Sequence, residues 1–263
     1  MKTPLIKISI LSIYKKNGVR VSLPERMAKC APDVYSSILA IKAELEDKSG
    51  NLYLSDLYRS YDMQLQAYLD WKTGKKSAYS PPPGGSMHEA GRAFDLDLEN
   101  LKIPLSSFWD IAKKHGVYPI INKPDPKISE SWHFDCRGSH GVIYEYYKNG
   151  FGTNMKSPYR AMAASAILAT GEKVDMFGSN QQEAAIQAGL IRLGFRLGNI
   201  DGNIGIKTRT ALDEAGIREG NLYDTLLAVE NLLQQKFPEE YAISQFFDSE
   251  GDDDFEIPSH VVI

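Results

Sequence analysis

The residues best able to do chemistry lie in two short segments. Residues 86–95 read Ser-Met-His-Glu-Ala-Gly-Arg-Ala-Phe-Asp, and residues 130–133 read Glu-Ser-Trp-His. The first segment carries His88, followed by a strand that delivers the carboxylate of Asp95; the second ends in His133. Two imidazoles and one carboxylate form a tetrahedral zinc site with its fourth position open. Because water or substrate can occupy an open position, the pattern predicts a catalytic metal site.

Glu130 is the candidate for proton transfer in such a site, since it lies three residues before His133. Zinc acidifies water and polarises a carbonyl, and a nearby carboxylate must then carry the proton to the leaving amine. From the residues alone, alternatives stay open. A single histidine is more often a hydrogen-bonded structural residue, and Asp97 shares a strand face with Asp95, so either could bind metal. Ser86 could orient the site, bind a substrate carboxylate or cap the turn.

Both segments resemble signatures of peptidase family M15, the D-alanyl-D-alanine metallopeptidases. Residues 86–95 look like the family's Ser-x-His-x-x-Gly-x-Ala-x-Asp signature. Residues 130–133 resemble its Glu-x-x-His signature, with Trp before the His, and the two occur in the family's order. The resemblance covers roughly residues 24–145. It implies an α+β zinc D-Ala-D-Ala peptidase domain with the hedgehog-like fold.

The resemblance also implies residue roles. It assigns one Zn²⁺ per chain to the ligands His88, Asp95 and His133. It makes Glu130 the general base. Residues 57–64, Leu-Tyr-Arg-Ser-Tyr-Asp-Met-Gln, resemble the family's Tyr-Arg-Ser stretch. The arginine there, Arg59, is implied to polarise the substrate carbonyl and stabilise the oxyanion.

Mixed helices and strands must position these residues. Apolar residues at helical spacing predict helices, and alternation predicts strands. A proline- and glycine-rich loop over 72–85 leads into the first signature. Strands and helices follow each other without a regular βαβ rhythm, which favours an α+β class. The predicted helices span 24–47, 61–72, 105–115, 158–170, 181–194, 207–215 and 222–236, and the predicted strands include 51–58, 92–98 and 131–135.

The C-terminal part resembles the small helical peptidoglycan-binding domain. The resemblance lies between Leu193 and Leu212 and includes an Asp201-Gly202 loop between two helices. Glycines and Asp201 suit a tight turn, and Thr208 lies in the first turn of the next helix. The Phe-Gln that usually follows the family's Ala-Leu is absent here. A plain helical packing or dimerisation module is the alternative.

These patterns predict a division into four parts. Residues 1–155 form the zinc peptidase domain, 156–175 a linker, 176–240 the peptidoglycan-binding-like helical domain and 241–263 an acidic tail.

Composition and charge argue against nucleic acid as a partner and against a membrane span. The net charge of −4 gives no basic footprint for nucleic acid, so none is expected as a partner. No apolar run reaches the ~18 residues of a membrane span, and the N-terminus reads as a strand rather than a signal peptide. We therefore expect synthesis in the cytoplasm and action on the cell wall by an unknown release route. Two cysteines are too few for a disulfide framework, and free thiols are expected.

The functional expectation is hydrolysis of D-amino-acid-containing bonds in the peptidoglycan stem peptide. D-Alanyl-D-alanine carboxypeptidase activity ranks first. An L-alanyl-D-glutamate endopeptidase of the phage endolysin type is the second reading. A non-catalytic wall-binding protein with a relic metal site is the third. The bond cut, the oligomeric state and the origin of the chain stay undetermined by sequence.

Overall fold

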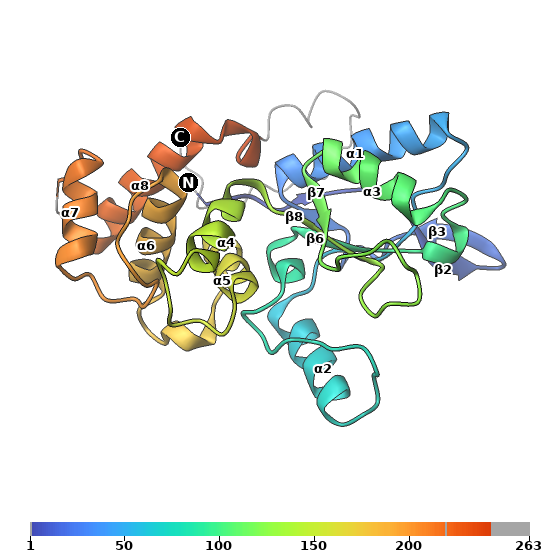
Figure 1. The fold of residues 1–263 in the computed structure, drawn as a ribbon, viewed down its shortest axis with the longest axis horizontal. Coiled ribbons are helices and arrows are strands. Elements are labelled where there is room, and N and C mark those ends of the chain that lie inside the picture. Colours follow the sequence, from blue (N-terminus) through green and yellow to red (C-terminus); the bar gives the residue numbers. More distant parts are fainter. Residues whose placement is uncertain (1, 219, 243–263) are drawn as a thin grey trace.

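The computed structural model describes residues 2–218 and 220–242 (Figure 1). The N-terminal part of the sequence forms a sheet-containing half, and the C-terminal part forms a helical half. This mixture agrees with the expected α+β class. The elements in chain order are β1 (Ile6–Lys7), β2 (Leu11–Lys16), β3 (Val19–Ser22), β4 (Lys29–Cys30), α1 (Pro32–Asp47), β5 (Leu54–Asp56), α2 (Tyr61–Lys72), η1 (Met87–Ala90), β6 (Ala93–Leu96), η2 (Leu98–Asn100), α3 (Leu105–Lys114), β7 (Val117–Pro119), β8 (His133–Cys136), η3 (Gly138–His140), α4 (Gly141–Lys148), α5 (Pro158–Thr170), η4 (Asp175–Phe177), α6 (Gln181–Leu193), α7 (Ile206–Glu214), α8 (Leu222–Lys236) and η5 (Pro238–Glu240).

The main sheet has six strands in the order β3-β2-β5-β6-β8-β7, and β1 and β4 form a separate pair. The neighbours in the main sheet are antiparallel except for β2 and β5. At its centre, Asp95 of β6 lies opposite His133 of β8, and Phe94 lies opposite Phe134. The two halves of the predicted metal site therefore meet across one strand pair.

Side chains alternate along a strand, so the β6–β8 pair has one face packed in the apolar core and one face that carries the site residues. Phe94 and Phe134 stack with ring centroids 5.9 Å apart, and Phe108 of α3 meets Phe134 edge-on at 4.8 Å. All three rings are fully buried in a core to which α1 and α3 contribute. Asp95 and His133 point to the opposite face, so burial of the phenylalanines fixes where the site residues point.

A second core joins the first signature to the helical half. Met87 and Ala90 of η1 belong to the same buried cluster as residues of α4, α5, α6 and α8. Residues 156–175, expected to be a linker, contain α5, in which every residue from Ala161 to Leu168 is buried. α5 packs directly on η1. The helical half therefore packs directly against η1, the element that carries His88.

Most predicted elements lie within a few residues of the observed ones, and α1 is the main exception. The helix was expected from Pro24 but begins at Pro32. Residues 24–28 form a turn instead, with the Met27 and Ala28 amides donating to the Pro24 carbonyl. β4 then pairs with β1 before Pro32 opens the helix at its first turn. Proline suits that position because its missing N–H is not needed there.

A buried ion network ties the C-terminal end to the first signature. Arg92, which follows Gly91, binds Asp33 of α1 through two hydrogen bonds of 2.8 and 2.9 Å. It also lies 3.4 Å from Glu240 of η5. Glu240 pairs with Arg192 of α6 at 2.6 Å and accepts hydrogen bonds from the amide and hydroxyl of Ser139. Two cations and two anions are therefore paired where Arg92 and Glu240 are almost fully buried.

The Asp201-Gly202 loop of the helical half is fixed by hydrogen bonds to the buried side chain of Gln187. The side-chain oxygen of Gln187 accepts from the Asp201 and Gly202 amides at 2.9 and 2.8 Å. Its amide group donates to Asp201 and to the Asn203 carbonyl. Gly202 has φ +76°, and a Cβ there would lie 2.8 Å from that of Asn180. The glycine of this motif is therefore required by the turn.

Three further expectations concern the cysteines, membrane spans and the acidic tail. Cys30 and Cys136 are free and buried, which confirms free thiols. Within the described residues, no helix is long and apolar enough to cross a bilayer. The acidic tail lies outside the described residues from position 243 onward.

We expect Glu240→Ala to destabilise the fold by about 3–5 kcal/mol, because it leaves Arg92 and Arg192 buried without their shared counter-charge. Urea denaturation measures the change, and Glu239→Ala, on the exposed neighbour, should stay within about 0.5 kcal/mol of the parent. Burial raises the pKa of Glu240, but Arg92 and Arg192 outweigh it and hold that pKa below its ordinary value. The stabilisation of the fold by ionised Glu240 should therefore be present near neutral pH. It should be lost as the pH falls through the lowered pKa of Glu240. Equal losses in the two variants would exclude the network as the cause.

Candidate metal centre

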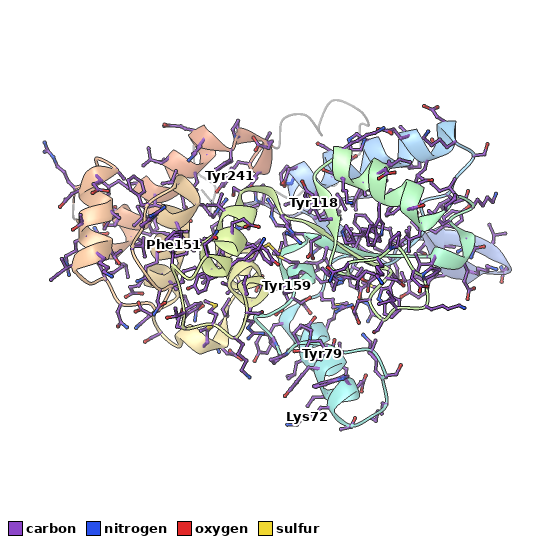
Figure 2. The ribbon with its side chains drawn as sticks, in the orientation of Figure 1. Lys72, Tyr79, Tyr118, Phe151, Tyr159 and Tyr241 are labelled. Atoms are coloured by element: carbon purple, nitrogen blue, oxygen red, sulfur yellow. The ribbon has the colours of Figure 1, made fainter. Side chains whose placement is uncertain are left out.

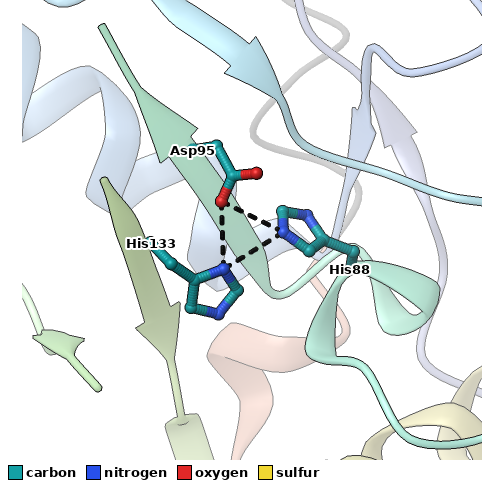
Figure 3. A group of neighbouring side chains, drawn as sticks. All are labelled: His88, Asp95 and His133. Carbon is teal, nitrogen blue, oxygen red and sulfur yellow. Dashed lines mark hydrogen bonds and ion pairs between the residues drawn. The ribbon is translucent and has the colours of Figure 1, made fainter. Parts of the chain in front are cut away.

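His88, Asp95 and His133 form a triangle of potential ligand atoms (Figure 3). His88 Nε2 lies 3.2 Å from His133 Nδ1 and 3.3 Å from Asp95 Oδ1. His133 Nδ1 lies 3.0 Å from the same carboxylate oxygen. All three residues are buried. The structure thus brings together the three residues that the sequence singled out as ligands.

His88 owes its position to a short 3-10 helix with caps at both ends. Ser86 accepts from the His88 amide, and Glu89 accepts in return from the Ser86 amide, which forms a capping box. Gly91 ends η1 in the left-handed conformation at φ +58°. A Cβ on Gly91 would lie 2.9 Å from the Cα of Cys30. Glycine therefore lets the chain turn from His88 into β6 against the neighbouring backbone.

Hydrogen bonds select which nitrogen of each imidazole faces the centre. His88 Nδ1 lies 2.7 Å from the Leu57 carbonyl, which can only accept, so Nδ1 carries the proton. His133 Nε2 lies 3.0 Å from Asp135 Oδ1. His88 Nε2 and His133 Nδ1 are consequently left as lone-pair donors. Backbone carbonyl and carboxylate partners of this kind orient histidines in metal sites.

The triangle fits a tetrahedral zinc ion. Bonds of about 2.0–2.1 Å at tetrahedral angles separate ligand atoms by roughly 3.3 Å, and the three observed edges are 3.0–3.3 Å. Two nitrogens and one oxygen also suit zinc. Burial alone would lower the pKa of His133, but Asp135 and Asp95 raise it to about 10. The surroundings therefore favour a positive charge, and the buried His-Asp-His group could hold a metal ion.

Arg59 approaches the centre from behind Asp95. Its Nη2 lies 3.3 Å from Asp95 Oδ2, the oxygen that does not face the histidines. Its Nε bonds Asp56 at 2.5 Å, and its Nη1 donates to Gln64 at 3.2 Å. The guanidinium is thereby fixed beside the site and lines the adjoining cavity. In this position it can orient Asp95 as well as face a substrate.

Glu130 lines the same cavity just before β8. It has φ +69°, and its carbonyl accepts from the His133 amide at 3.0 Å. Its buried Oε1 has no hydrogen-bond partner among the described residues. Burial raises the pKa of Glu130, although His133 opposes this effect. A carboxylate with a free, buried oxygen beside the ligand triangle is suited to accepting a proton from a reactant.

Asp135 and Tyr159 belong to the site but were not predicted. Asp135 Oδ1 faces His133 and also accepts from the Tyr159 hydroxyl at 3.2 Å. Strand alternation from His133 could have identified Asp135, since 133 and 135 share a face. Nothing local could have identified Tyr159, because α5 brings it from the helical half.

Two other candidates from the sequence have structural partners. Asp97 accepts from Arg20 at 3.0 Å and from Asn100 at 2.8 Å, which places its carboxylate in a partly buried network outside the ligand triangle. The Ser86 hydroxyl caps η1 while the residue also lines the cavity. Its substrate-binding role stays a proposal.

The ligand triangle opens into a cavity of about 620 Å³. The walls come from the loop after α2, the segment before β8 and the start of α5. Tyr159, labelled near the centre of the molecule in Figure 2, lies where the two halves meet. The volume falls within the range of small-molecule and peptide-sized pockets.

The chain matches no protein-family model and no curated protein. Among solved structures it is similar to the LdcB LD-carboxypeptidase, described for its peptidoglycan recognition, with 17% identity, a TM-score of 0.38, and coverage of 50% of this chain and 66% of that one. It is also similar to the L,D-carboxypeptidase DacB from Streptococcus pneumoniae, with 17% identity, a TM-score of 0.33, and coverage of 49% and 85%. Both similarities are coarse and extend over about half of this chain.

We expect Asp135→Ala to weaken zinc binding by about 10- to 100-fold, because His133 loses the carboxylate that orients it. Tyr159→Phe should cause a smaller loss, since it removes one hydrogen bond to Asp135 and leaves the carboxylate in place. Competition with a chromophoric chelator measures both affinities. Asp97→Ala is the matched control and should bind zinc like the parent. A folded Asp135→Ala protein with unchanged affinity would show that His133 does not depend on this contact.

Proposed function

We propose that this chain is a zinc-dependent peptidase that hydrolyses D-amino-acid-containing bonds of the peptidoglycan stem peptide. The observation that carries the proposal is the buried triangle of His88, Asp95 and His133 with Glu130 beside it. Its substrate class rests on the resemblance of residues 86–95 and 130–133 to the D-alanyl-D-alanine metallopeptidases.

The division of labour follows from the donor atoms. His88 Nε2, Asp95 Oδ1 and His133 Nδ1 would hold the zinc ion. When bound, zinc supplies a Lewis acid that polarises the scissile carbonyl and makes water more acidic. Glu130 takes a proton on Oε1 and passes it to the leaving amine. The Arg59 guanidinium stabilises negative charge on the carbonyl oxygen. Ser86, at the cavity wall, is proposed to contact the substrate.

Two peptidase activities with different products and one non-catalytic role are ranked. Carboxypeptidase action on a terminal D-Ala-D-Ala ranks first. Endopeptidase action on the L-Ala–D-Glu bond ranks second. The relic wall-binding protein ranks third, because Glu130 is present with a free oxygen and a relic site has no need of a base. In each version, residues 176–240 are proposed to bind the wall.

Digestion of purified muropeptides separates the versions. We expect mass spectrometry to show the loss of one D-alanine from pentapeptide stems, because a carboxypeptidase removes the terminal residue. Free stem peptides would identify an endopeptidase instead. No change after zinc loading, with metal binding confirmed, would support the wall-binding protein.

We expect Glu130→Gln to lower kcat by about 10²–10⁴-fold while zinc binding is retained, because it removes a proton acceptor and no ligand. His133→Ala should weaken zinc binding itself. Asp97→Asn removes a carboxylate outside the centre and should retain both activity and zinc. Loss of zinc from Glu130→Gln would mean that Glu130 is a ligand, and full activity would assign proton transfer to another group.

A further inference from the structure

The cavity beside the ligand triangle has an excess of positive charge. Its only acidic lining residues among the described ones are Asp95 and Glu130, and both have roles in the proposed chemistry. The lining cations are Arg59, Lys76, Arg137, Lys156 and Arg160. A cavity of this composition favours an anionic ligand.

Two of the three cavity-lining arginines, Arg59 and Arg160, already have protein partners. Arg59 pairs with Asp56 and Asp95. Arg160 donates to the carbonyls of Pro82 and Pro83 at 3.2 and 3.4 Å. Their guanidinium groups are therefore partly satisfied before any ligand enters.

Arg137 differs from these two arginines because its guanidinium forms no ion pair or hydrogen bond with any of the described residues. Its guanidinium carbon lies 4.7 Å from the Tyr144 ring centroid and 5.3 Å from that of Tyr118. Its buried Nε has no hydrogen-bond partner within the described part of the chain. Aromatic faces hold an arginine in place but do not satisfy its hydrogen-bond donors. Arg137 is thus held in the cavity wall by aromatic contacts, and its charge has no counter-ion among the described residues.

The sheet register gives the distance of this group from the metal centre. Arg137 directly follows β8 and begins the turn into η3, and it lines the same cavity as His133. Tyr118, whose ring lies against the guanidinium, pairs in register with Asp135. The guanidinium therefore lies two to four residues along the strand from His133, or roughly 7–13 Å at about 3.3 Å per residue. An extended peptide covers that span in about two to four residues.

We propose that Arg137 binds a substrate carboxylate two to four residues away from the scissile bond. This inference rests on the proposed peptidase function and specifies its substrate as an acidic peptide longer than a dipeptide. A guanidinium binds a carboxylate through two parallel hydrogen bonds, which the two terminal nitrogens, Nη1 and Nη2, can supply. In a stem peptide the free carboxylate of D-glutamate is such a group. A free D-Ala-D-Ala dipeptide has none at this distance.

Equilibrium binding of two synthetic pentapeptides tests the assignment. One is L-Ala-γ-D-Glu-L-Lys-D-Ala-D-Ala, and the other carries D-isoglutamine in place of D-glutamate, so that one carboxylate becomes an amide. Binding is measured on zinc-loaded protein in a Glu130→Gln background, where turnover is not expected to interfere. We expect Arg137→Gln to weaken binding of the acidic peptide by about 10- to 100-fold, the effect of losing a charge-assisted pair. The amidated peptide should respond by less than about twofold.

Lys148→Gln is the matched control. Lys148 also lies over the Tyr144 ring, at 5.9 Å, but it pairs with Glu145 and does not line the cavity. The Lys148→Gln substitution removes a positive charge next to the same ring. The Lys148→Gln protein should bind both peptides like the parent. Arg137→Lys should recover only part of the affinity, because it restores the charge without the two-pronged geometry.

The outcomes separate this inference from the proposed function. Equal losses for both peptides in Arg137→Gln, or no loss for either, would overturn the inference even if the Glu130-intact protein hydrolyses muropeptides. Charge-dependent binding through Arg137 in a protein that hydrolyses no muropeptide would support the inference and reject the proposed function.

Discussion

The pairing of β6 with β8 is the constraint on which the rest of the structure depends. It sets Asp95 opposite His133 and Phe94 opposite Phe134. A slip by one residue would turn the carboxylate and imidazole into the apolar core and the phenylalanines into the cavity. Burial of the stacked rings under α1 and α3 therefore fixes the ligand geometry. The hydrophobic core holds the chemical site in register.

The other ligand, His88, depends on a second set of contacts. η1 is capped by Ser86 and Glu89 and covered by α5. The network from Asp33 through Arg92 to Glu240 then ties the following turn to the end of the helical half. Because these charges are buried, each requires its partner. The C-terminal helices thus contribute to the support of the metal centre as well as forming a candidate wall-binding surface.

The electrostatic design of the cavity links the two halves of the proposed function. Carboxylates lie around the imidazoles, where a cation is favoured, and cations lie on the walls beyond them. Such a separation attracts a metal ion to the base of the cavity and an acidic peptide to its walls. Arg59 lies at the border, since it contacts Asp95 and also faces the open space.

The sequence by itself determined the local features of this protein. The spacing within residues 86–95 and 130–133 made His88, Asp95, His133 and Glu130 candidates, and the resemblance to two family signatures selected them over Asp97. The structure brings the three ligand candidates together and places Glu130 in the adjoining cavity, and their roles stay proposals. Helical periodicity located most helices to within a few residues, because apolar spacing reflects burial on one face. It failed at residues 24–31, where a turn and the β1–β4 pairing override a continuing apolar pattern.

Only the tertiary structure decided what depends on distant segments meeting. Tyr159 reaches Asp135 because α5 packs on η1, and no local pattern carries that information. Glu240 is buried between two arginines although it stands in an acidic, polar stretch of sequence. Arg137 is singled out because its guanidinium pairs with no group of the described residues, a property of its three-dimensional surroundings. Local spacing thus specifies which groups can bind a metal, whereas packing of the two halves determines how they are oriented and which charges remain free.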